Sequence, residues 1–478
     1  MNEAIEIAGT ERRLLRRIAS APRVPTPVRG LAARLEASHL AYRLAHGAFW
    51  SLAGAVVSRI LALAASVVTA RVLGRSTYGE LGALSATILT FQAFASLGLG
   101  MTATKYVAEL RSTDPGRAGR ILALSWVASA AAGVLATALL AAFAPWLSAR
   151  ALDAPHLGGH LRIAGVGLLF TTVASAQQGA LAGFEAFRRI TWVNVWAGLI
   201  GVAVSVAGVW GWGLDGAVWA LVLTSAVQWA LTELAVRSRA AEEGIAIRLR
   251  GFWAERSVFW RFSLPALAQG IMVSPVTWAA SAILVNQPGG YLEMGAFSAA
   301  NQWYGAVMFL PAALGGALLP VLSERIGQSD RAGARKVLRT AVAVNAAAVI
   351  PIVLAGSAAS PWIMGMYGPG FAAAWPTLVI VLATAGLVAV LNPVGSVLAA
   401  SGRLWLGFWM NSGWAAALLL MTVLLARSGA LGVASARLIA YGIHAVWTAW
   451  YAVRFVASRA EPRSVAGAIP APLEGGTR

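Results

Sequence analysis

Two arginines inside otherwise apolar stretches are the strongest candidates for chemistry in this chain. Arg59 lies within the apolar window 48–69 and Arg437 within the window 430–455. A charge at the centre of a bilayer costs about 2.5–3.5 kcal/mol on insertion scales, so such residues usually face a polar cavity or a binding partner. Arg59, near the middle of its window, is expected to face water or an anion. Arg437 lies closer to a window end, where its side chain can also reach the membrane surface. A structural contact with a helix end or polar side chain is the alternative for Arg59.

Small and polar residues recur at helical spacing beside Arg59, which predicts one face of a helix that lines a cavity. These residues are Ser51, Ala55, Ser58, Ala62, Ser66 and Thr69. A similar stripe follows in window 259–285, at Ser263, Gly270, Ser274, Thr277 and Ser281. Met272 stands there in the place that corresponds to Arg59, so we expect the cationic site only in the first half of the chain.

Uncharged amides within the apolar windows supply hydrogen-bonding groups that could line a cavity for sugars. They are Gln92, Gln177, Gln178, Gln269, Asn301, Gln302 and Asn392. Because polar side chains also join helices inside membranes, each of them alone fits a structural role equally well.

Three prolines interrupt apolar windows and are candidate hinges: Pro275, Pro311 and Pro393. A proline inside a helix removes a backbone hydrogen bond and adds a steric clash, so it kinks the helix. Static kinks and moving hinges are equally consistent with the sequence.

Groups for enzymatic chemistry are scarce in the sequence. The only lysines, Lys105 and Lys336, do not follow glycine, so the phosphate-binding loop of ATPases is missing. The chain has no cysteine, and its five histidines are scattered, which indicates neither a metal site nor another cofactor. We therefore expect a protein that is not an enzyme and needs no cofactor.

The composition places these candidates in a membrane. Hydrophobic residues make up 58% of the chain and charged residues 12%, about half the charge of soluble domains. Apolar windows long enough to cross a bilayer predict twelve transmembrane helices in an all-α polytopic protein. The windows lie near 48–69, 79–103, 121–144, 161–182, 190–212, 214–235, 259–285, 292–318, 337–357, 376–400, 404–426 and 430–455.

Positive charge is distributed unevenly around these windows. The net charge is +18, but most of the 37 Lys and Arg residues fall on one side of the predicted helices. The positive-inside rule then predicts that both termini are cytoplasmic in a multi-pass cell membrane protein. The charge also indicates an affinity for anionic lipids, rather than a nucleic-acid partner.

A phrase of nine residues occurs twice and indicates an internal duplication. Tyr78–Ala86 reads YGELGALSA, and Tyr291–Ala299 reads YLEMGAFSA. Further matches occur in the same order, such as RAG at 117–119 and 331–333. Six windows per copy predict two lobes related by a pseudo-twofold axis along the membrane normal, around a central site. We attribute the phrase itself to close helix packing through small residues.

The duplication divides the chain into two lobes and three basic or polar segments. The predicted ranges are 1–47 for a basic cytoplasmic tail, 48–235 for the first lobe, 236–258 for a basic interlobe linker, 259–455 for the second lobe and 456–478 for a cytoplasmic tail.

The stretch SRILALAASVVTARVLG, which starts at Ser58, and the phrase MYGPGFAAAWPTL at 366–378 resemble oligosaccharide flippases. These are the Wzx-like branch of the multidrug/oligosaccharidyl-lipid/polysaccharide (MOP) exporter superfamily. The resemblance implies a V-shaped pair of lobes and a cationic cavity for a polyprenyl diphosphate headgroup with its glycan. Lipid II flippases of the same superfamily carry a similar Ser-Arg in their first helix, which corresponds to Ser58-Arg59.

The sequence therefore predicts a flippase that moves a polyprenyl-diphosphate-linked oligosaccharide from the inner to the outer leaflet, by alternating access, for polysaccharide synthesis. Other polysaccharide-assembly proteins are expected partners. Two alternatives stay open. A secondary exporter of soluble drugs or metabolites would carry a carboxylate within the membrane, and a glycan polymerase or ligase would carry a long outer loop with acidic or basic residues.

Overall fold

The computed structural model describes residues 39–457, except 97, 259–262, 264–271, 316–317, 329 and 402–403. Helices are the only regular elements in this part of the chain. The first half contains α3 (His39–Ala95), α4 (Leu99–Leu110), α5 (Pro115–Trp146), the π-helical turn η1 (Leu147–Ala151), α6 (Leu157–Gly183), α7 (Phe187–Glu242) and the 3-10 turn η2 (Phe252–Glu255). The second half contains α9 (Val273–Val285), α10 (Gly290–Gly315), α11 (Leu318–Gly327), α12 (Arg331–Ala358), α13 (Ser360–Met366), α14 (Pro369–Ala372), α15 (Trp375–Ala400), α16 (Leu404–Leu425), the 3-10 turn η4 (Ala426–Ser428) and α17 (Gly429–Ala457).

Two of these helices are hairpins with a glycine at the bend. Gly74 in α3 has φ 75°, and Gly213 in α7 has φ 56°, a backbone region that other residues rarely adopt. The chain then packs back on itself: Ser66 and Tyr78 share a hydrogen bond of 2.6 Å. A Cβ on Gly208 would lie 2.6 Å from the carbonyl oxygen of Gly216. Small residues thus let the two arms of the α7 hairpin approach closely.

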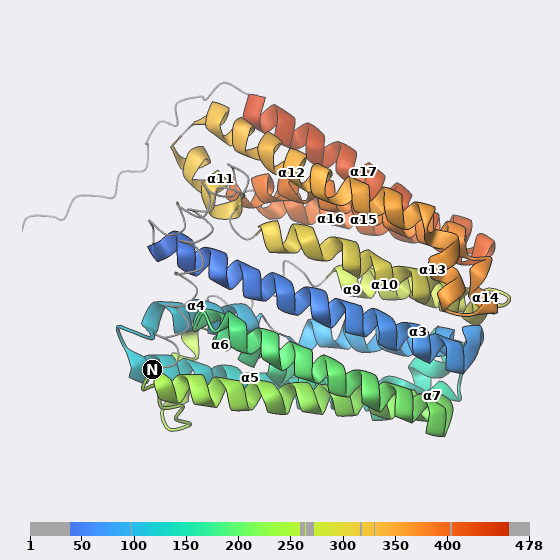
Figure 1. The fold of residues 1–478 in the computed structure, drawn as a ribbon, viewed down its shortest axis with the longest axis horizontal. Helices are drawn as coiled ribbons and strands as arrows, with labels where there is room; N and C mark the ends of the chain where they lie inside the picture. Colours follow the sequence, from blue (N-terminus) through green and yellow to red (C-terminus); the bar gives the residue numbers. More distant parts are fainter. Residues whose placement is uncertain are drawn as a thin grey trace, which may run out of the picture.

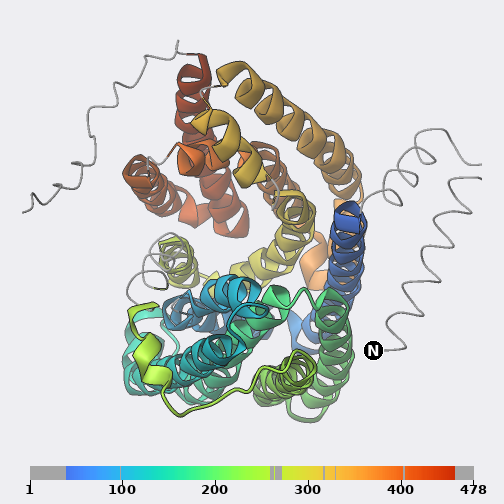
Figure 2. The same cartoon turned by 90° about the vertical axis from the view of Figure 1, so that its left-hand side faces the viewer.

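Seven helical stretches among the described residues are long and apolar enough to cross a membrane. They run roughly parallel to the long axis of the molecule (Figure 1). Viewed along that axis, the helices of the first half gather in one part of the picture and those of the second half in another (Figure 2). The protein is therefore polytopic, and the helix bounds agree with the apolar windows to within a few residues in α5, α6 and α15.

The doubled phrase is where the two halves touch most closely. A Cβ on Gly79 would lie 1.9 Å from the carbonyl oxygen of Tyr291, and one on Gly295 would lie 2.0 Å from that of Arg75. Such distances leave room for hydrogen only, so α3 and α10 pack backbone against backbone here. We call this region, next to the Gly74 bend, the closed end.

Ionic and hydrogen bonds reinforce the closed end. Arg75 Nη2 lies 2.7 Å from Glu293 Oε1, and its Nε and Nη1 donate to the carbonyl oxygens of Leu292 and Gly370. Glu293 Oε2 accepts a hydrogen bond of 2.9 Å from Ala430 N, at the start of α17. The ion pair thus ties α3 to α10, and the hydrogen bonds of the same two side chains connect this pair to α14 and α17. The two residues of the ion pair lie 218 positions apart in the chain, so sequence spacing alone does not predict the pair.

Candidate functional site

A cavity of about 630 Å³ lies between the two halves. Residues of α3 and α7 form its wall on one side, and residues of α9, α10, α16 and α17 form it on the other. The volume is within the range of about 300–1,000 Å³ that is usual for small-molecule sites. This cavity is the candidate site.

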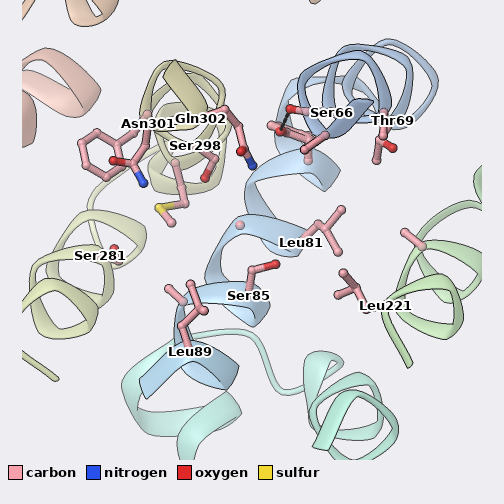
Figure 3. Close-up of a pocket in the computed structure, with 18 of the residues that line it drawn as sticks. Ser66, Thr69, Leu81, Ser85, Leu89, Leu221, Ser281, Ser298, Asn301 and Gln302 are labelled. Carbon is pink, nitrogen blue, oxygen red and sulfur yellow. Dashed lines mark hydrogen bonds between the residues drawn. The ribbon is translucent and has the colours of Figure 1, made fainter. Parts of the chain in front are cut away.

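Hydroxyl groups dominate the polar part of the cavity wall. Figure 3 shows Ser66 and Thr69 on α3 and, to their left in this view, Ser298, Asn301 and Gln302 on α10. The hydroxyl residues of the wall are Ser58, Ser66, Thr69, Tyr78, Ser85, Thr90, Ser205, Thr224, Ser225, Ser274, Thr277, Ser281 and Ser298. Each hydroxyl can both donate and accept a hydrogen bond, so this wall can adapt to a ligand that does the same.

Both small-residue stripes identified in the sequence contribute to this wall. Ser58, Ala62, Ser66 and Thr69 come from the first stripe, and Ser274, Thr277 and Ser281 from the second. Thr90 Oγ1, in the second arm of α3, also donates to the carbonyl oxygen of Ser274, at 3.3 Å, which joins α3 to the second stripe across the halves. The remaining member with a described side chain, Ser263, lies outside the cavity and bonds Thr102.

Arg437 is the one charged side chain among the described residues that line the cavity. Its Nη1 donates to Asn301 Oδ1 at 2.7 Å, and its guanidinium lies 3.9 Å from the centre of the Tyr304 ring. Its buried Nε has no hydrogen-bond partner among the described residues. A cation held by a ring and an amide, with no carboxylate beside it, can attract an anionic group of a ligand.

Arg59 is not among the residues that line this cavity. Its guanidinium packs on the backbone of α10, where a Cβ on Gly305 would lie 2.9 Å from Nη2. Ser58 faces the cavity, but one residue later the helix has turned by about 100°. Ile60, the next residue, is 60% exposed on the outside of the molecule. Arg59 therefore lies at the seam of α3 and α10, between the cavity and the outer surface.

The predicted amides divide into two groups. Asn301 and Gln302 line the cavity, whereas Gln92, Gln177, Gln178 and Asn392 do not. Gln177 is fully buried and donates through Nε2 to Glu233, so it joins α6 to α7. Gln177 thus has the helix-joining role that the sequence left open beside a cavity role. Gln269 falls outside the described residues.

The candidate hinge prolines occupy two kinds of position. Pro311 and Pro393 are buried inside α10 and α15. Pro275 is the third residue of α9 as described, which begins at Val273. In a first turn the backbone N–H has no partner within the helix, so a proline there costs little.

Sequence reasoning missed several cavity residues that the doubled phrase could have indicated. Ser85 and Ser298 occupy the same position in the two copies, and both line the cavity. Gly82 of the first copy approaches Ser298 of the second, since a Cβ on Gly82 would lie 2.1 Å from Ser298 Oγ. The phrase thus forms both the closed end and the adjoining cavity wall.

Comparisons with known proteins identify the relatives of this chain. The sequence profile of the family described as "Polysaccharide biosynthesis protein" matches residues 44–325, more than half of the chain, and the MatE profile matches residues 267–411. The EPS I polysaccharide export inner membrane protein EpsE of Ralstonia nicotianae is 27% identical over 371 residues, which cover 75% of this chain and 81% of that protein.

Solved structures with the same fold include transporters of two kinds. An inward-facing multidrug resistance MATE transporter of the MOP superfamily has a TM-score of 0.65 at 14% identity, over 83% of this chain and 94% of that one. The lipid II flippase MurJ, in an inward closed conformation, has a TM-score of 0.64 at 13% identity, over 83% of this chain and 86% of that one. The chain belongs to the polysaccharide biosynthesis protein family, within the MOP exporter superfamily.

Proposed function

We propose that this protein is a flippase that carries a polyprenyl-diphosphate-linked oligosaccharide from the inner to the outer leaflet by alternating access. The polarity of the cavity wall carries the proposal. Its described residues include one guanidinium, two amides and many hydroxyls, and no carboxylate. A glycan presents hydroxyls that hydrogen-bond with such a wall, and a diphosphate supplies the negative charge that Arg437 attracts.

The same polarity argues against a carrier of cationic drugs. A cation inside a low-dielectric cavity needs an opposite charge or an aromatic face to offset its desolvation. The described lining includes the aromatic side chains of Tyr78, Trp278 and Phe297 but no carboxylate, and the guanidinium of Arg437 would repel a cation. A soluble-substrate exporter is therefore the second candidate, supported by the MatE profile match alone.

The cavity also has an apolar part that suits the lipid. Leu89 of α3, Leu221 of α7 and Val273 of α9 belong to its wall and are all partly exposed. We propose that the polyprenyl tail stays in the bilayer beside this part while the headgroup enters the polar part. Arg59, at the α3–α10 seam, is then a second cation within reach of an anionic headgroup that enters between the halves.

The membrane arrangement that we propose has twelve spans in two lobes. The α3 and α7 hairpins each cross twice, as does the pair α16 and α17. α9 and α10 are added to the remaining candidate spans. The lobes comprise 48–235 and 259–455, joined by the linker 236–258, with cytoplasmic tails at 1–47 and 456–478. The inner membrane location follows the name of the Ralstonia relative.

Leaflet transfer in proteoliposomes tests this function. A labelled polyprenyl-diphosphate oligosaccharide is reconstituted with the wild type, with Arg437→Ala and with the matched control Arg150→Ala, whose side chain is exposed outside the cavity. We expect transfer by the wild type and the control, and a loss of about tenfold or more in Arg437→Ala, since a charge-assisted contact is worth about 1.5–3 kcal/mol. Export of soluble cations without any lipid transfer would favour the second candidate.

A further inference from the structure

The segment between the halves presents an unusual surface at the end of the molecule away from the Gly74 bend. Figure 2 shows this segment crossing the viewer-facing ends of the first-half helices. Leu249 is 65% exposed and Trp253 is 61% exposed. Two large apolar side chains on a polar loop lie outside any core, and a surface of this kind usually marks an interaction.

The segment is fixed in place rather than loosely attached. Glu255 is 7% exposed, and its two carboxylate oxygens accept from Arg117 at 3.0 Å and from Arg120 at 3.2 Å. Ile245 and Val258 are buried in the core that α4, α5 and α7 share. The exposure of Leu249 and Trp253 is therefore a built feature of a docked segment.

Positive charge surrounds the two apolar side chains. Arg248, Arg250 and Arg256 are exposed, and no acidic side chain of the described residues forms an ion pair with any of them. Nearby acids are already engaged: Glu255 with Arg117 and Arg120, and Glu242 and Glu243 with Arg239. The three guanidiniums are thus available to an outside anion.

Apolar side chains beside free guanidiniums match one surface closely, the interface of an anionic bilayer. Trp prefers the headgroup level of membranes, and a leucine inserts more deeply. Lys and Arg residues close to the surface bind anionic headgroups by Coulomb attraction. The segment connects helices that cross the membrane, so the bilayer surface is close to it.

We propose that residues 248–256 form a docking surface for anionic phospholipids, in which Leu249 and Trp253 insert into the headgroup region and Arg248, Arg250 and Arg256 bind the phosphates. This surface is separate from the cavity and does not depend on the cargo that the cavity carries. It anchors the connection between the two halves to the adjoining leaflet.

Spin labels test the insertion, because the chain has no cysteine that would compete for labelling. A nitroxide is placed at Leu249→Cys or Trp253→Cys in the full chain, and at Gln328→Cys, an exposed turn of the second half, as the control. In vesicles that contain phosphatidylglycerol, we expect both linker labels to collide with oxygen more often than with a water-soluble nickel complex. In vesicles of phosphatidylcholine alone, the linker labels should instead collide more often with the nickel complex. The control label should collide more often with the nickel complex in both kinds of vesicle.

The charge is tested by Arg248→Gln, Arg250→Gln and Arg256→Gln, singly and together. Each replacement should lower the affinity of the protein for spin-labelled phosphatidylglycerol about fivefold. Concentrated salt should do the same for the unaltered protein, which excludes a folding artefact. Equal exposure of both linker labels to water in the two kinds of vesicle would overturn the proposal. Protection of the labels from both reagents would also overturn it, because that result indicates a protein partner.

Discussion

The ion pair between Arg75 and Glu293 should control how often the closed end opens. The side chain of Arg75 is 19% exposed and that of Glu293 is 34% exposed, so the pair is intermediate between surface and buried ion pairs. Surface pairs contribute about 0–1 kcal/mol, whereas breaking a buried pair costs about 3–5 kcal/mol. Glu293→Gln should therefore destabilise the closed arrangement by about 1–2 kcal/mol and shift the ratio of open to closed molecules about 5- to 30-fold.

The duplication supplies a matched control for this variant. Glu80 has the same position in the first copy of the doubled phrase, but its partner is His156, an exposed side chain of the same half. Glu80→Gln removes the same charge without breaking an ion pair between the halves. It should leave the ratio of open to closed molecules within about twofold of the wild type.

Pulsed electron–electron double resonance measures distances between two spin labels. It therefore gives the ratio of open to closed molecules whichever way the protein is oriented in the membrane. Spin labels at Arg150→Cys and Arg427→Cys report the distance across the closed end, since both side chains are exposed and lie on different halves. Glu293→Gln should increase the population of long distances. If Glu80→Gln increased it equally, or if Glu293→Gln left it unchanged, the ion pair would not hold the halves together.

Three further predictions concern stability and are checked by thermal unfolding of the purified protein. Gly79→Ala and Gly295→Ala should each cost about 1–3 kcal/mol of unfolding free energy, because the new Cβ would overlap a backbone oxygen. Gly442→Ala, in open space, should have no such cost. Equal effects of the three variants would refute the close packing. Gly213→Ala should lower the unfolding free energy by about 1 kcal/mol, because alanine rarely adopts the φ of 56° found there. Gly211→Ala, two residues earlier and in open space, should have no such cost. An unchanged stability of Gly213→Ala would contradict the hairpin bend. Asp330 accepts hydrogen bonds from Gly333 N and from Arg325, and both lower its pKa below the usual value of 3.8. The stability that ionised Asp330 contributes is therefore present above that pH and is lost as the pH falls through the lower folded-state value. Asp330→Asn should lose this acid-dependent part of the stability, and an unchanged acid profile would argue against it.

The apolar windows were sufficient to place helices, because about 20 apolar residues must become a helix where no water can satisfy the backbone. The bends at Gly74 and Gly213 also fall where one window ends and the next begins. The short helices α11, α13 and α14 were missed, since they lack the length and hydrophobicity of a span. Hydrophobicity along the chain thus locates the long helices of this protein.

The direction in which a polar side chain points was much harder to predict. Arg59 was placed in the cavity from its depth in a window, yet Gly305 of another helix leaves room for its guanidinium at the seam. Gln177 looked like a cavity residue, but Glu233, far along the chain, bonds it inside the first half. Glu293 lies in the first turn of α10, and it bonds Arg75 and Ala430 of other helices. These outcomes depend on partners from distant helices, which one-dimensional spacing does not specify.

Site-specific photocrosslinking tests the central claim, that the cavity receives the lipid-linked glycan, most directly. A photoreactive amino acid is placed at Ser281 or Gln302, which line the cavity, and at Gln92 or Asn392, polar positions outside it. We predict that a labelled polyprenyl-diphosphate oligosaccharide crosslinks to the first pair and not to the second, and that excess unlabelled lipid-linked glycan prevents the reaction. Equal crosslinking at all four positions, or its absence from Ser281 and Gln302 in a protein that still transfers the lipid, would contradict the account.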